Sequence, residues 1–353
     1  MPKIAIDVRE ACREKRTGKG QWTYGFTSEL LKRSAIEVIL LSDQEVPANW
    51  RNSASKIISF QKGLLWHFKV AKTLKTLSNL DLYLSPTSYI VPALLGKKVN
   101  VIPVVHDLIA FRSEQHDRKA RIVEKSLLKR TLLKAAHICT VSESTKNDLL
   151  KRYSFLESAK VTPILAGPMR EDEALNIPDH KTILCAGTLS PRKNQLSLIE
   201  AYRMLPKELK EQFKLILIGG RGWHDSEILK TIKETQGVEW KGHVTDDEYE
   251  ALMRSCTVFA LPSLYEGFGL QLLDALKRGV PILTSKRGSI PEVVGDCAVF
   301  INPEDKADIA QGLRRILTDE ALRGRLKTRG HEYAEQYSWQ HSVDLFMHAV
   351  HDI

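Results

Sequence analysis

Cysteine, long hydrophobic runs and secretion signals are scarce or absent in this sequence of 353 residues. The five cysteines are scattered, odd in number and never spaced as CxxC, which argues against a disulfide framework or a zinc ribbon. No apolar stretch approaches the roughly 18 residues that a membrane-spanning helix needs. The chain opens on a β-branched run and not on a charged segment followed by an apolar one. We therefore expect a cytoplasmic protein.

Motifs for metals and nucleic acids are also missing. The eleven histidines form no HExxH or other ligand-spaced cluster, and no acidic cluster suited to a divalent cation is apparent. There is no aromatic-studded basic sheet and no recognised nucleic-acid motif. We expect no metal, no other cofactor and no nucleic-acid partner.

The charge is uneven along the chain. Residues 1–165 carry 28 Lys and Arg against 15 Asp and Glu, a balance of +13. Residues 166–353 carry 24 against 28, a balance of −4. A basic half beside a mildly acidic one suggests that one domain meets something anionic.

Short β-branched runs alternate with amphipathic helical segments from one end of the chain to the other. The runs that we interpret as strands are 3–8, 37–42, 80–86, 99–108, 137–142, 182–188, 213–220, 238–244, 256–262, 280–285 and 297–303. Helical periodicity is clearest at 21–33, 121–136, 195–205, 225–234 and 245–256. This alternation predicts an α/β protein with parallel sheets covered by helices on both faces. Between the two halves, residues 166–180 are rich in proline, glycine and charge, so we place a linker at 168–180 after a first domain of 1–167.

A glutamate on a glycine-flanked turn is the main signal for a site. Glu266 follows a predicted strand, and a helix is expected from near Gly269 to Arg278. Gly267 and Gly269 would let the backbone approach a ligand closely, while the first amides of the helix attract phosphate. A carboxylate beside an anion site suits the binding of hydroxyl groups. The alternative is that Glu266 is a solvated turn residue.

Three other features lie near this turn in the sequence. Asp274 comes eight residues after Glu266, about two helical turns, and could face the same ligand or be a surface acid. Gly279 stands where a glycine ends a helix. Thr245 followed by Glu248 predicts a capping box at the start of a helix.

A second segment places two cations beside a strand end. Arg192 and Lys193 follow a predicted strand and precede a predicted helix. Arginine offers a bidentate fork and lysine a point charge, so the pair predicts a pyrophosphate clamp. A solvated basic turn is the alternative.

The first half offers two weaker signals. Gly18 and Gly20 fall between the first predicted strand and helix, as in a phosphate-approach loop, although the pattern is not GxGxxG. His106 and Asp107 end a strand at the edge where ligands bind. A lone histidine is also commonly a packed or solvated residue.

Together these segments resemble the retaining nucleotide-sugar glycosyltransferases of family 4, and in particular bacterial mannosyltransferases of polysaccharide assembly. The likeness covers nearly the whole chain and is densest from residue 182 to 305, where it is carried by 187–202, 261–285 and 290–305. It implies a GT-B fold, in which two Rossmann-like doubly wound domains face each other across a cleft. It also implies a donor domain at 181–337 and a last helix, 338–353, that crosses back to the first domain.

The resemblance assigns a role to each matching position. Glu266 would hold the donor sugar's hydroxyls, Asp274 the nucleotide ribose, and Arg192 with Lys193 the pyrophosphate. Asp274 stands where the family usually has glutamate, one methylene longer. The implied catalytic residues are Glu266, His106, Arg192 and Lys193. The implied donor-binding residues are Gly18, Gly20, Gly187, Arg192, Lys193, Glu266, Gly267, Phe268, Gly269, Leu270 and Asp274.

The function expected from the resemblance is retaining transfer of a hexose, with mannose from GDP-mannose as the first choice. The acceptor would be a saccharide or lipid-linked saccharide in the synthesis of cell-surface polysaccharide or lipopolysaccharide. A UDP-sugar or another nucleotide sugar is an open alternative, as are phosphorolysis or epimerisation on the same fold. A non-catalytic nucleotide-sugar sensor or scaffold is the alternative of another class.

Residues 118–134 form a basic amphipathic pattern with seven cationic residues and one acid. Such a helix is typical of contact with an anionic membrane, here the inner face of the cytoplasmic membrane. The alternative is a solvated helix whose leucines face the core.

Overall fold

A computed structural model describes residues 1–63, 65–95, 99–112, 118–170, 180–351 and 353. These residues form two compact units. The first unit comprises Met1–Arg112, the described residues that follow up to Met169, and Tyr337–Ile353. The second unit is formed by the described residues from Arg170 to Gln336. The centre of the linker predicted at 168–180 lies outside the described residues.

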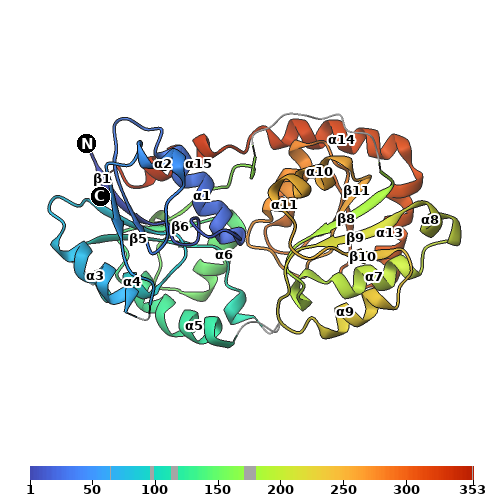
Figure 1. Ribbon diagram of the computed structural model, residues 1–353, viewed down its shortest axis with the longest axis horizontal. Coiled ribbons are helices and arrows are strands. Elements are labelled where there is room, and N and C mark those ends of the chain that lie inside the picture. Colours follow the sequence, from blue (N-terminus) through green and yellow to red (C-terminus); the bar gives the residue numbers. More distant parts are fainter. Residues whose placement is uncertain (64, 96–98, 113–117, 171–179, 352) are drawn as a thin grey trace. The chain divides into compact units, whose positions relative to one another are not determined.

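The first unit is built on a parallel sheet with the strand order β3-β2-β1-β4-β5-β6-β7 (Figure 1). Its strands are β1 (Lys3–Asp7), β2 (Glu37–Ser42), β3 (Lys56–Ser59), β4 (Leu82–Ser85), β5 (Asn100–Val105), β6 (Ile138–Thr140) and β7 (Val161–Pro163). Its α-helices are α1 (Gly18–Leu30), α2 (Ala48–Arg51), α3 (Trp66–Thr76), α4 (Ile90–Leu95), α5 (Arg118–Leu132), α6 (Glu143–Arg152) and α15 (Trp339–Ala349). Helices α3 and α4 cover one face of this sheet, and α1 with α15 covers the other.

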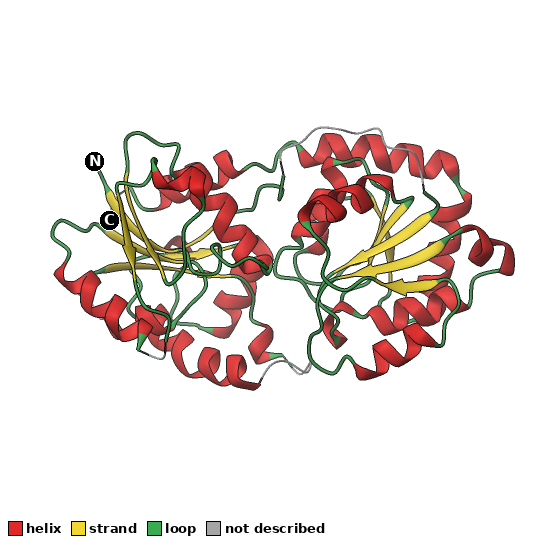
Figure 2. Cartoon of the chain, in the orientation of Figure 1, coloured by secondary structure: helices red, strands yellow, loops and turns green. Residues whose placement is uncertain are grey.

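The second unit has a parallel sheet with the order β10-β9-β8-β11-β12-β13, again surrounded by helices (Figure 2). Its strands are β8 (Thr182–Ala186), β9 (Lys214–Ile218), β10 (Val238–Trp240), β11 (Val258–Leu261), β12 (Ile282–Ser285) and β13 (Ala298–Ile301). Its α-helices are α7 (Gln195–Arg203), α8 (Lys207–Gln212), α9 (Ser226–Lys233), α10 (Asp246–Ser255), α11 (Leu270–Lys277), α12 (Ile290–Val294), α13 (Lys306–Thr318) and α14 (Glu320–Ala334). Every residue of β8, β11 and β12 is buried, as expected for strands covered on both faces.

Both sheets reverse their strand order at one point. In the first sheet this point lies between β1 and β4, and in the second it lies between β8 and β11. Connections on either side of such a point leave the sheet toward opposite faces, which opens a crevice at the carboxyl ends of the two strands. The segments that follow β1, β4, β8 and β11 are therefore placed to bind ligands.

The α/β class with two doubly wound, Rossmann-like units is confirmed. Two strands were not predicted from the sequence, β3 and β7. β3 is short and has no residue that is fully buried, and β7 is a three-residue edge strand that ends on a proline, so neither has a strong apolar pattern. The predicted capping box is confirmed, because the Thr245 and Glu248 side chains each bond to the other's backbone amide.

One local prediction was wrong. Gly18 and Gly20 were placed in a loop, but they lie in the first turn of α1. The helix begins early because Thr17 is its N-cap and accepts a hydrogen bond from the amide of Gly20 at 3.4 Å. Gly20 has a packing role there, since a Cβ atom would lie 2.5 Å from the carbonyl oxygen of Glu10.

The C-terminal helix α15 packs inside the first unit. The indole nitrogen of Trp339 donates to the carbonyl of Pro168 at 2.8 Å. Its ring fills the space beside Gly25, where an added Cβ would lie 2.1 Å from the indole. Phe346 then stacks edge-on against Phe26 in α1, with ring centroids 5.4 Å apart. This helix is thus part of the core of the first unit.

The end of α11 gives a test of backbone geometry. Gly279 follows the helix with φ +64°, and its neighbours form the two reversed hydrogen bonds that close a helix end, Gly279 N to Leu276 O and Val280 N to Ala275 O. We expect Gly279→Ala to lower the free energy of unfolding by about 1 kcal/mol or more, because an alanine is strained at positive φ. Urea-induced unfolding measures this change.

Gly324→Ala is the matched control, because Gly324 is exposed within α14 and an added Cβ would have no atom within 4 Å. We expect that substitution to stabilise the protein by about 0.5 to 1 kcal/mol. Equal effects of the two alanines would contradict the assignment of Gly279.

Candidate active site

Glu266 lies in the turn that connects β11 to α11 in the second unit, and its side chain is buried. Arg192 donates from Nη1 to Glu266 Oε2 at 2.7 Å, and Lys193 donates from Nζ to Oε1 at 2.7 Å. Ser263 donates from Oγ to Oε1 at 2.6 Å. We call these four residues the Glu266 cluster. The structure thus brings Glu266 together with the Arg192–Lys193 pair, which the sequence analysis selected from a separate segment.

The cluster sits at the point where the strand order of the second sheet reverses. Arg192 and Lys193 belong to a short 3-10 helix after β8, and Glu266 follows the neighbouring strand β11. A backbone hydrogen bond from Leu264 N to Arg192 O, 2.9 Å long, joins the two segments. Asn194, at φ 59°, also donates to the carbonyls of Pro262 and Pro303 at 3.1 and 2.7 Å. The crossover order of the chain therefore sets the cations beside the carboxylate.

Electrostatics keep this carboxylate ionised. Burial opposes ionisation of Glu266, but Arg192 and Lys193 outweigh it and lower its pKa to about 2. Burial also lowers the pKa of Lys193, and Glu266 counters that effect. The balance is a buried carboxylate flanked by two cations, which presents net positive charge at the carboxyl edge of the sheet.

A second set of contacts fixes the backbone of the turn between β11 and α11. The Oγ of Ser289 lies 3.1 Å from the carbonyl oxygen of Glu266 and 2.9 Å from that of Phe268. Gly288 allows this close approach, since a Cβ at its φ of +57° would lie 2.4 Å from the Glu266 carbonyl. Ser285 donates to the carbonyl of Ser263 at 2.6 Å. These short polar residues fix the backbone from which Glu266 projects.

Helix α11 starts directly after this turn. Gly269 is its N-cap with φ +98°, and Leu270 is its first residue. Glycine has no side chain to cap the first amides of the helix, so the dipole end stays available to an anion. Gly267 and the buried Phe268 complete the segment predicted to bind the donor.

Asp274 is fully buried and lies among other polar side chains. Its Oδ2 accepts from the hydroxyl of Tyr249 at 3.1 Å, and Arg278 Nη1 lies 3.7 Å from its Oδ1. Arg278 also forms an ion pair with Glu250 in α10. The interpretation of Asp274 as a surface acid was therefore wrong, and its role at a ribose stays a prediction.

In the first unit, His106 follows β5 and is buried. Its Nε2 lies 2.7 Å from the carbonyl oxygen of Pro86, which only accepts, so Nε2 carries the hydrogen. Burial, aided by the charge of Lys19, lowers the pKa of His106 to about 3. The ring is therefore neutral at physiological pH, and its Nδ1 is a hydrogen-bond acceptor.

Gly187 follows β8 at φ +149°, a backbone conformation that favours glycine. A Cβ there would lie 3.2 Å from Lys193 Cε, so Gly187 also leaves room for the lysine stem. Gly18 has open space around it, whereas Gly20 packs on the preceding loop. The donor-binding roles predicted for these glycines stay predictions.

The sequence analysis missed Ser263, Asn194 and Tyr249. Ser263 stands three residues before Glu266, a spacing at which a serine can reach a side chain across a turn, so a signal existed. Asn194 and Tyr249 act on partners 68 and 25 residues away, which no local pattern reveals. Among the residues that the structure describes, no group of three or more His, Cys, Asp or Glu could hold a metal ion. Nor is any helix of this described part long and apolar enough to cross a membrane.

The chain thus has two doubly wound α/β units, and a cation–carboxylate cluster lies where the strand order of the second sheet reverses, an edge at which such sheets bind ligands. The family model described as "Glycosyl transferases group 1" matches residues 170–333, and the model "Glycosyltransferase Family 4" matches residues 26–167. The O-antigen chain mannosyltransferase B of Escherichia coli is 32% identical over 284 residues, which cover 76% of this chain and 73% of that protein. The chain belongs to the family 4 glycosyltransferases with the GT-B fold.

Other relatives match over shorter segments. The serotype-specific mannosyltransferase WbdA of Escherichia coli is 35% identical over 175 residues, which cover 48% of this chain but only 21% of WbdA. Among solved structures, Anabaena HepE in complex with UDP and glucose superposes with a TM-score of 0.79 at 17% identity, covering 100% of both chains. WaaG, described as a glycosyltransferase of lipopolysaccharide biosynthesis, superposes with a TM-score of 0.74 at 16% identity and 98% coverage of both chains. At these identities the structures establish the fold alone.

The buried cluster predicts a pH-dependent loss of stability. We expect Glu266→Gln to lower the free energy of unfolding by about 3 kcal/mol at pH 7, because it leaves Lys193 buried without a carboxylate. The stability contributed by the lowered pKa is present above pH 4.5 and disappears as pH falls toward 2, so the difference from wild type should narrow over that interval. Urea unfolding at several pH values measures both effects.

Glu304→Gln provides the control, because Glu304 and Arg287 form an ion pair with both side chains well exposed. Removing that pair should cost less than about 1 kcal/mol at any pH. A difference between Glu266→Gln and wild type that stays constant from pH 7 to pH 2.5 or so would contradict the proposed ionisation.

Proposed function

We propose that this glycosyltransferase is a retaining hexosyltransferase that moves mannose from GDP-mannose onto a saccharide or lipid-linked saccharide acceptor in the synthesis of cell-surface polysaccharide. The observation that carries the proposal is the Glu266 cluster at the switch point of the second sheet. The mannosyltransferases among the relatives support the choice of mannose. A UDP-sugar is the second candidate, because UDP occupies the structurally similar HepE.

Departure of the nucleoside diphosphate builds negative charge where the cations lie. Arg192 can offer its fork to two phosphate oxygens, while Lys193 supplies a buried point charge. Both groups are already oriented by Glu266 at 2.7 Å, so little reorganisation is needed when the charge develops. The first amides of α11 add a positive dipole end to the same anion. The cluster thereby stabilises the leaving group without a metal ion.

The carboxylate of Glu266 can accept more hydrogen bonds than it does in this structure. Its two oxygens accept three hydrogen bonds from side chains, and an ionised carboxylate offers about four acceptor positions. The remaining position suits a hydroxyl of the donor sugar. We assign Glu266 to binding and positioning, and not to nucleophilic attack, because its lowered pKa and paired oxygens make it a weak nucleophile. The phosphate that leaves can itself take the acceptor's proton.

The imidazole of His106 fits a binding role toward a sugar. Its Nε2–H is held by the Pro86 carbonyl, which fixes the ring and leaves Nδ1 as an acceptor for a hydroxyl. Its lowered pKa favours the neutral ring near pH 7, which suits a hydrogen-bond acceptor better than a proton donor. A positioning contact is therefore the role that we propose for it.

Release of nucleoside diphosphate from a panel of nucleotide sugars tests this function. We expect turnover of GDP-mannose, faster when acceptor lipid extract is added. Arg192→Ala and Lys193→Ala should each lower kcat by about 100- to 1,000-fold, because each removes charge stabilisation of the leaving group. Lys230→Ala, at an exposed position of α9, is the control and should behave as wild type.

If a UDP-sugar is turned over faster than GDP-mannose, the donor that we propose is wrong. The role proposed for the Glu266 cluster would not change, because that cluster binds the diphosphate. Binding of a nucleotide sugar without turnover, even with acceptor extract, would instead support a sensor.

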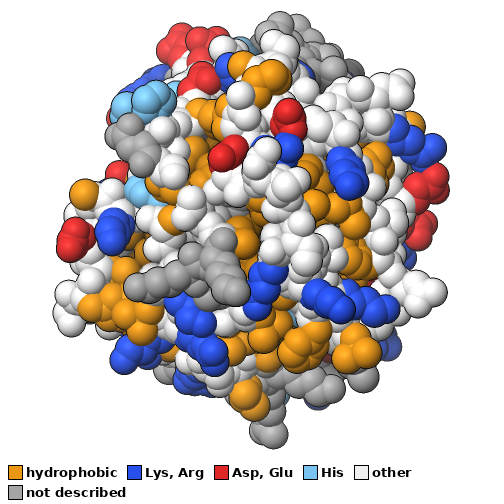
Figure 3. Space-filling view, turned by 90° about the vertical axis from the view of Figure 1, so that its left-hand side faces the viewer, with side chains coloured by type: hydrophobic (Ala, Val, Ile, Leu, Met, Phe, Trp, Pro, Cys, Tyr) orange, Lys and Arg blue, Asp and Glu red, His pale blue; other side chains and the backbone are white. Residues whose placement is uncertain are grey.

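We further propose that the first unit contacts the cytoplasmic face of an anionic membrane through residues 118–134. In α5, Leu128 and Leu132 are buried against the core, so the core-facing alternative holds for these two leucines. Ile122, however, is 65% exposed on the same helix, and Lys129 and Arg130, about two turns further along, are exposed as well. Figure 3 shows hydrophobic side chains interspersed with Lys and Arg on one face of the first unit. Such a mixture suits the boundary between lipid headgroups and acyl chains.

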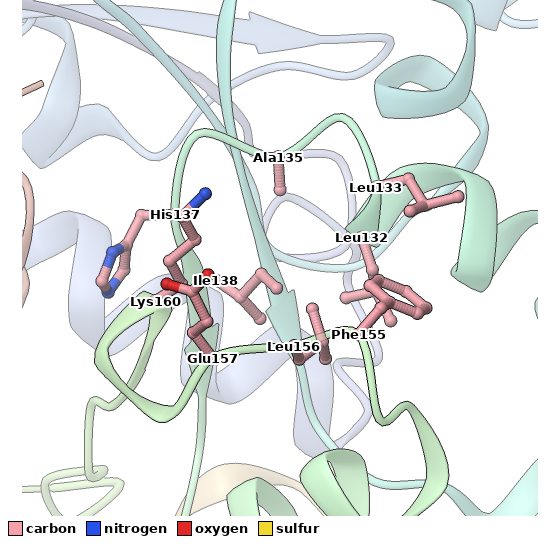
Figure 4. A pocket seen from close by; sticks show the side chains of 9 residues that line it. All are labelled: Leu132, Leu133, Ala135, His137, Ile138, Phe155, Leu156, Glu157 and Lys160. Carbon is pink, nitrogen blue, oxygen red and sulfur yellow. The ribbon is translucent and has the colours of Figure 1, made fainter.

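A pocket of about 170 Å³ lies at the end of α5 (Figure 4). Leu132, Leu133 and Phe155 form an apolar wall, and Lys160 brings a positive charge to its lining. Leu133 and Phe155 are 58% and 40% exposed, so two large apolar side chains reach the surface at this pocket. Glu157 also lines this pocket and offsets the charge of Lys160, so we assign the membrane contact to the exposed face of α5 and not to the pocket.

Vesicle co-sedimentation tests the membrane contact. Lys125→Gln, Lys129→Gln and Arg130→Gln together should weaken binding to phosphatidylglycerol vesicles by about 100-fold, at roughly 1 kcal/mol for each cation. The control replaces Lys207, Lys230 and Lys233 of the second unit by glutamine, an equal change in charge at exposed positions. Equal loss in both triple variants, or equal binding to neutral phosphatidylcholine, would contradict a specific contact of α5.

A further inference from the structure

A glutamate stands on the inner face of α5, among apolar residues. Glu124 is only 7% exposed, and Leu128, one turn further along the helix, is fully buried. Helix α5 packs on α4 and on the short 3-10 helix Ile109–Phe111. Within the part of the chain that the structure describes, Oε1 of Glu124 is buried without a hydrogen-bond partner. This is an unusual position for a carboxyl group.

Three segments bring polar groups to the place where Glu124 lies. Helix α5 follows β5 and leads into β6, so its first turns lie at the carboxyl edge of the first sheet. Lys19, in the first turn of α1, follows β1 at that edge, and Asp107 is the second residue after β5. The charges of Lys19 and Asp107 both act on Glu124. The carboxyl edge of a doubly wound sheet is where ligands bind.

The cost of this arrangement argues for a ligand. A buried polar atom that lacks a partner costs about 1 to 3 kcal/mol, and more for a charged group. Burial raises the pKa of Glu124 to about 7, and Lys19 offsets only part of that effect. A leucine at this position would extend the apolar cluster formed by Leu128 and Leu132. A carboxyl group that weakens the core in this way is expected where a substrate completes its hydrogen bonds.

The nature of the surroundings points to a neutral hydroxylated ligand. A metal ion would need several more oxygen, nitrogen or sulfur ligands, and the described residues offer no such group here. A cationic ligand would be repelled by Lys19, and an anionic one by Glu124 and Asp107. A sugar presents neighbouring hydroxyls that can donate to a carboxylate and accept from a lysine at the same time.

We propose that Glu124 and Lys19 form a subsite of the first unit that binds hydroxyl groups of the acceptor saccharide, with Glu124 Oε1 accepting a hydrogen bond from one hydroxyl. This assignment rests on the proposed function, since it takes the acceptor to be a saccharide. Glu124 is a binding residue in it, which orients the acceptor and takes no proton in the reaction.

Binding of methyl α-mannobioside, followed by saturation-transfer NMR, tests the subsite. We expect Glu124→Gln to weaken binding by about 10-fold or more, because a hydrogen bond to a charged acceptor is replaced by one to a neutral amide. Glu157→Gln is the matched control, the same chemical change at an exposed position of the first unit. GDP binding, measured in parallel, should be the same in all three proteins, which separates this subsite from the donor site.

The pH dependence gives a second readout. The charges of Lys19 and Asp107 influence the pKa of Glu124, and the charge of Glu124 in turn influences the pKa values of Tyr89 and Tyr153. The disaccharide should bind wild type more weakly as pH falls below 7, when Glu124 takes up a proton, and Glu124→Gln should lack this inflection. Because the pKa of Glu124 is raised in the folded protein, the free energy of unfolding of wild type falls as pH rises from 4.5 through 7. Glutamine does not ionise, so Glu124→Gln should unfold at a higher temperature than wild type at pH 8.

Clear outcomes would overturn the proposal. If wild type does not bind the disaccharide, or if Glu124→Gln binds it as wild type does, Glu124 is a core residue without a ligand. Should Glu124→Gln fail to fold, Glu124→Asp, which withdraws the carboxylate by one methylene, must weaken binding in its place. If the wild-type protein binds the disaccharide but does not turn over GDP-mannose, the proposed function is contradicted and the proposed subsite is not.

Discussion

The pairing of Glu266 with Arg192 and Lys193 is the interaction on which the second unit's chemistry depends. Both contacts are 2.7 Å long; the one to Lys193 is buried and the one to Arg192 is part-buried, so charges interact more strongly there than in water. Burial disfavours the charged form of both Lys193 and Glu266, and each offsets this effect for the other. The cluster therefore stores positive charge at a fixed place, ready for the phosphates of a nucleotide sugar.

Sheet topology gives the cluster its location. The chain forms β8, moves outward to β9 and β10, and then returns to place β11 on the other side of β8. This reversal sets the segment after β8 beside the segment after β11, although Arg192 and Glu266 are 74 residues apart. The first sheet repeats the same principle between β1 and β4, where Lys19 and the Pro86 carbonyl lie on segments that follow these strands. One folding rule thus produces a polar edge in each unit.

Much of this could be predicted from the sequence, because regular elements leave local patterns. The strand runs, the capping box at Thr245 and the helix end at Gly279 all depend on residues close together in the chain. β3 and β7 were not predicted because they are short. The start of α1 was predicted too late in the chain, because Thr17 caps the helix before its apolar pattern begins. The burial of Asp274 could not be foreseen, since its partner Tyr249 lies 25 residues away on another helix.

The class of fold, the family and the charged residues of the site can be read from the amino-acid sequence, since these follow from periodicity, spacing and motif. Which of those residues come into contact depends on the folded chain. It paired Arg192 and Lys193 with one carboxylate, supported the turn through Ser263 and Ser289, and fixed the tautomer of His106 through the Pro86 carbonyl. It also buries Glu124, whose Oε1 has no hydrogen-bond partner among the residues that the structure describes. The physical reason is that desolvation and pairing depend on distances between segments remote in the chain, and a linear pattern does not contain those distances.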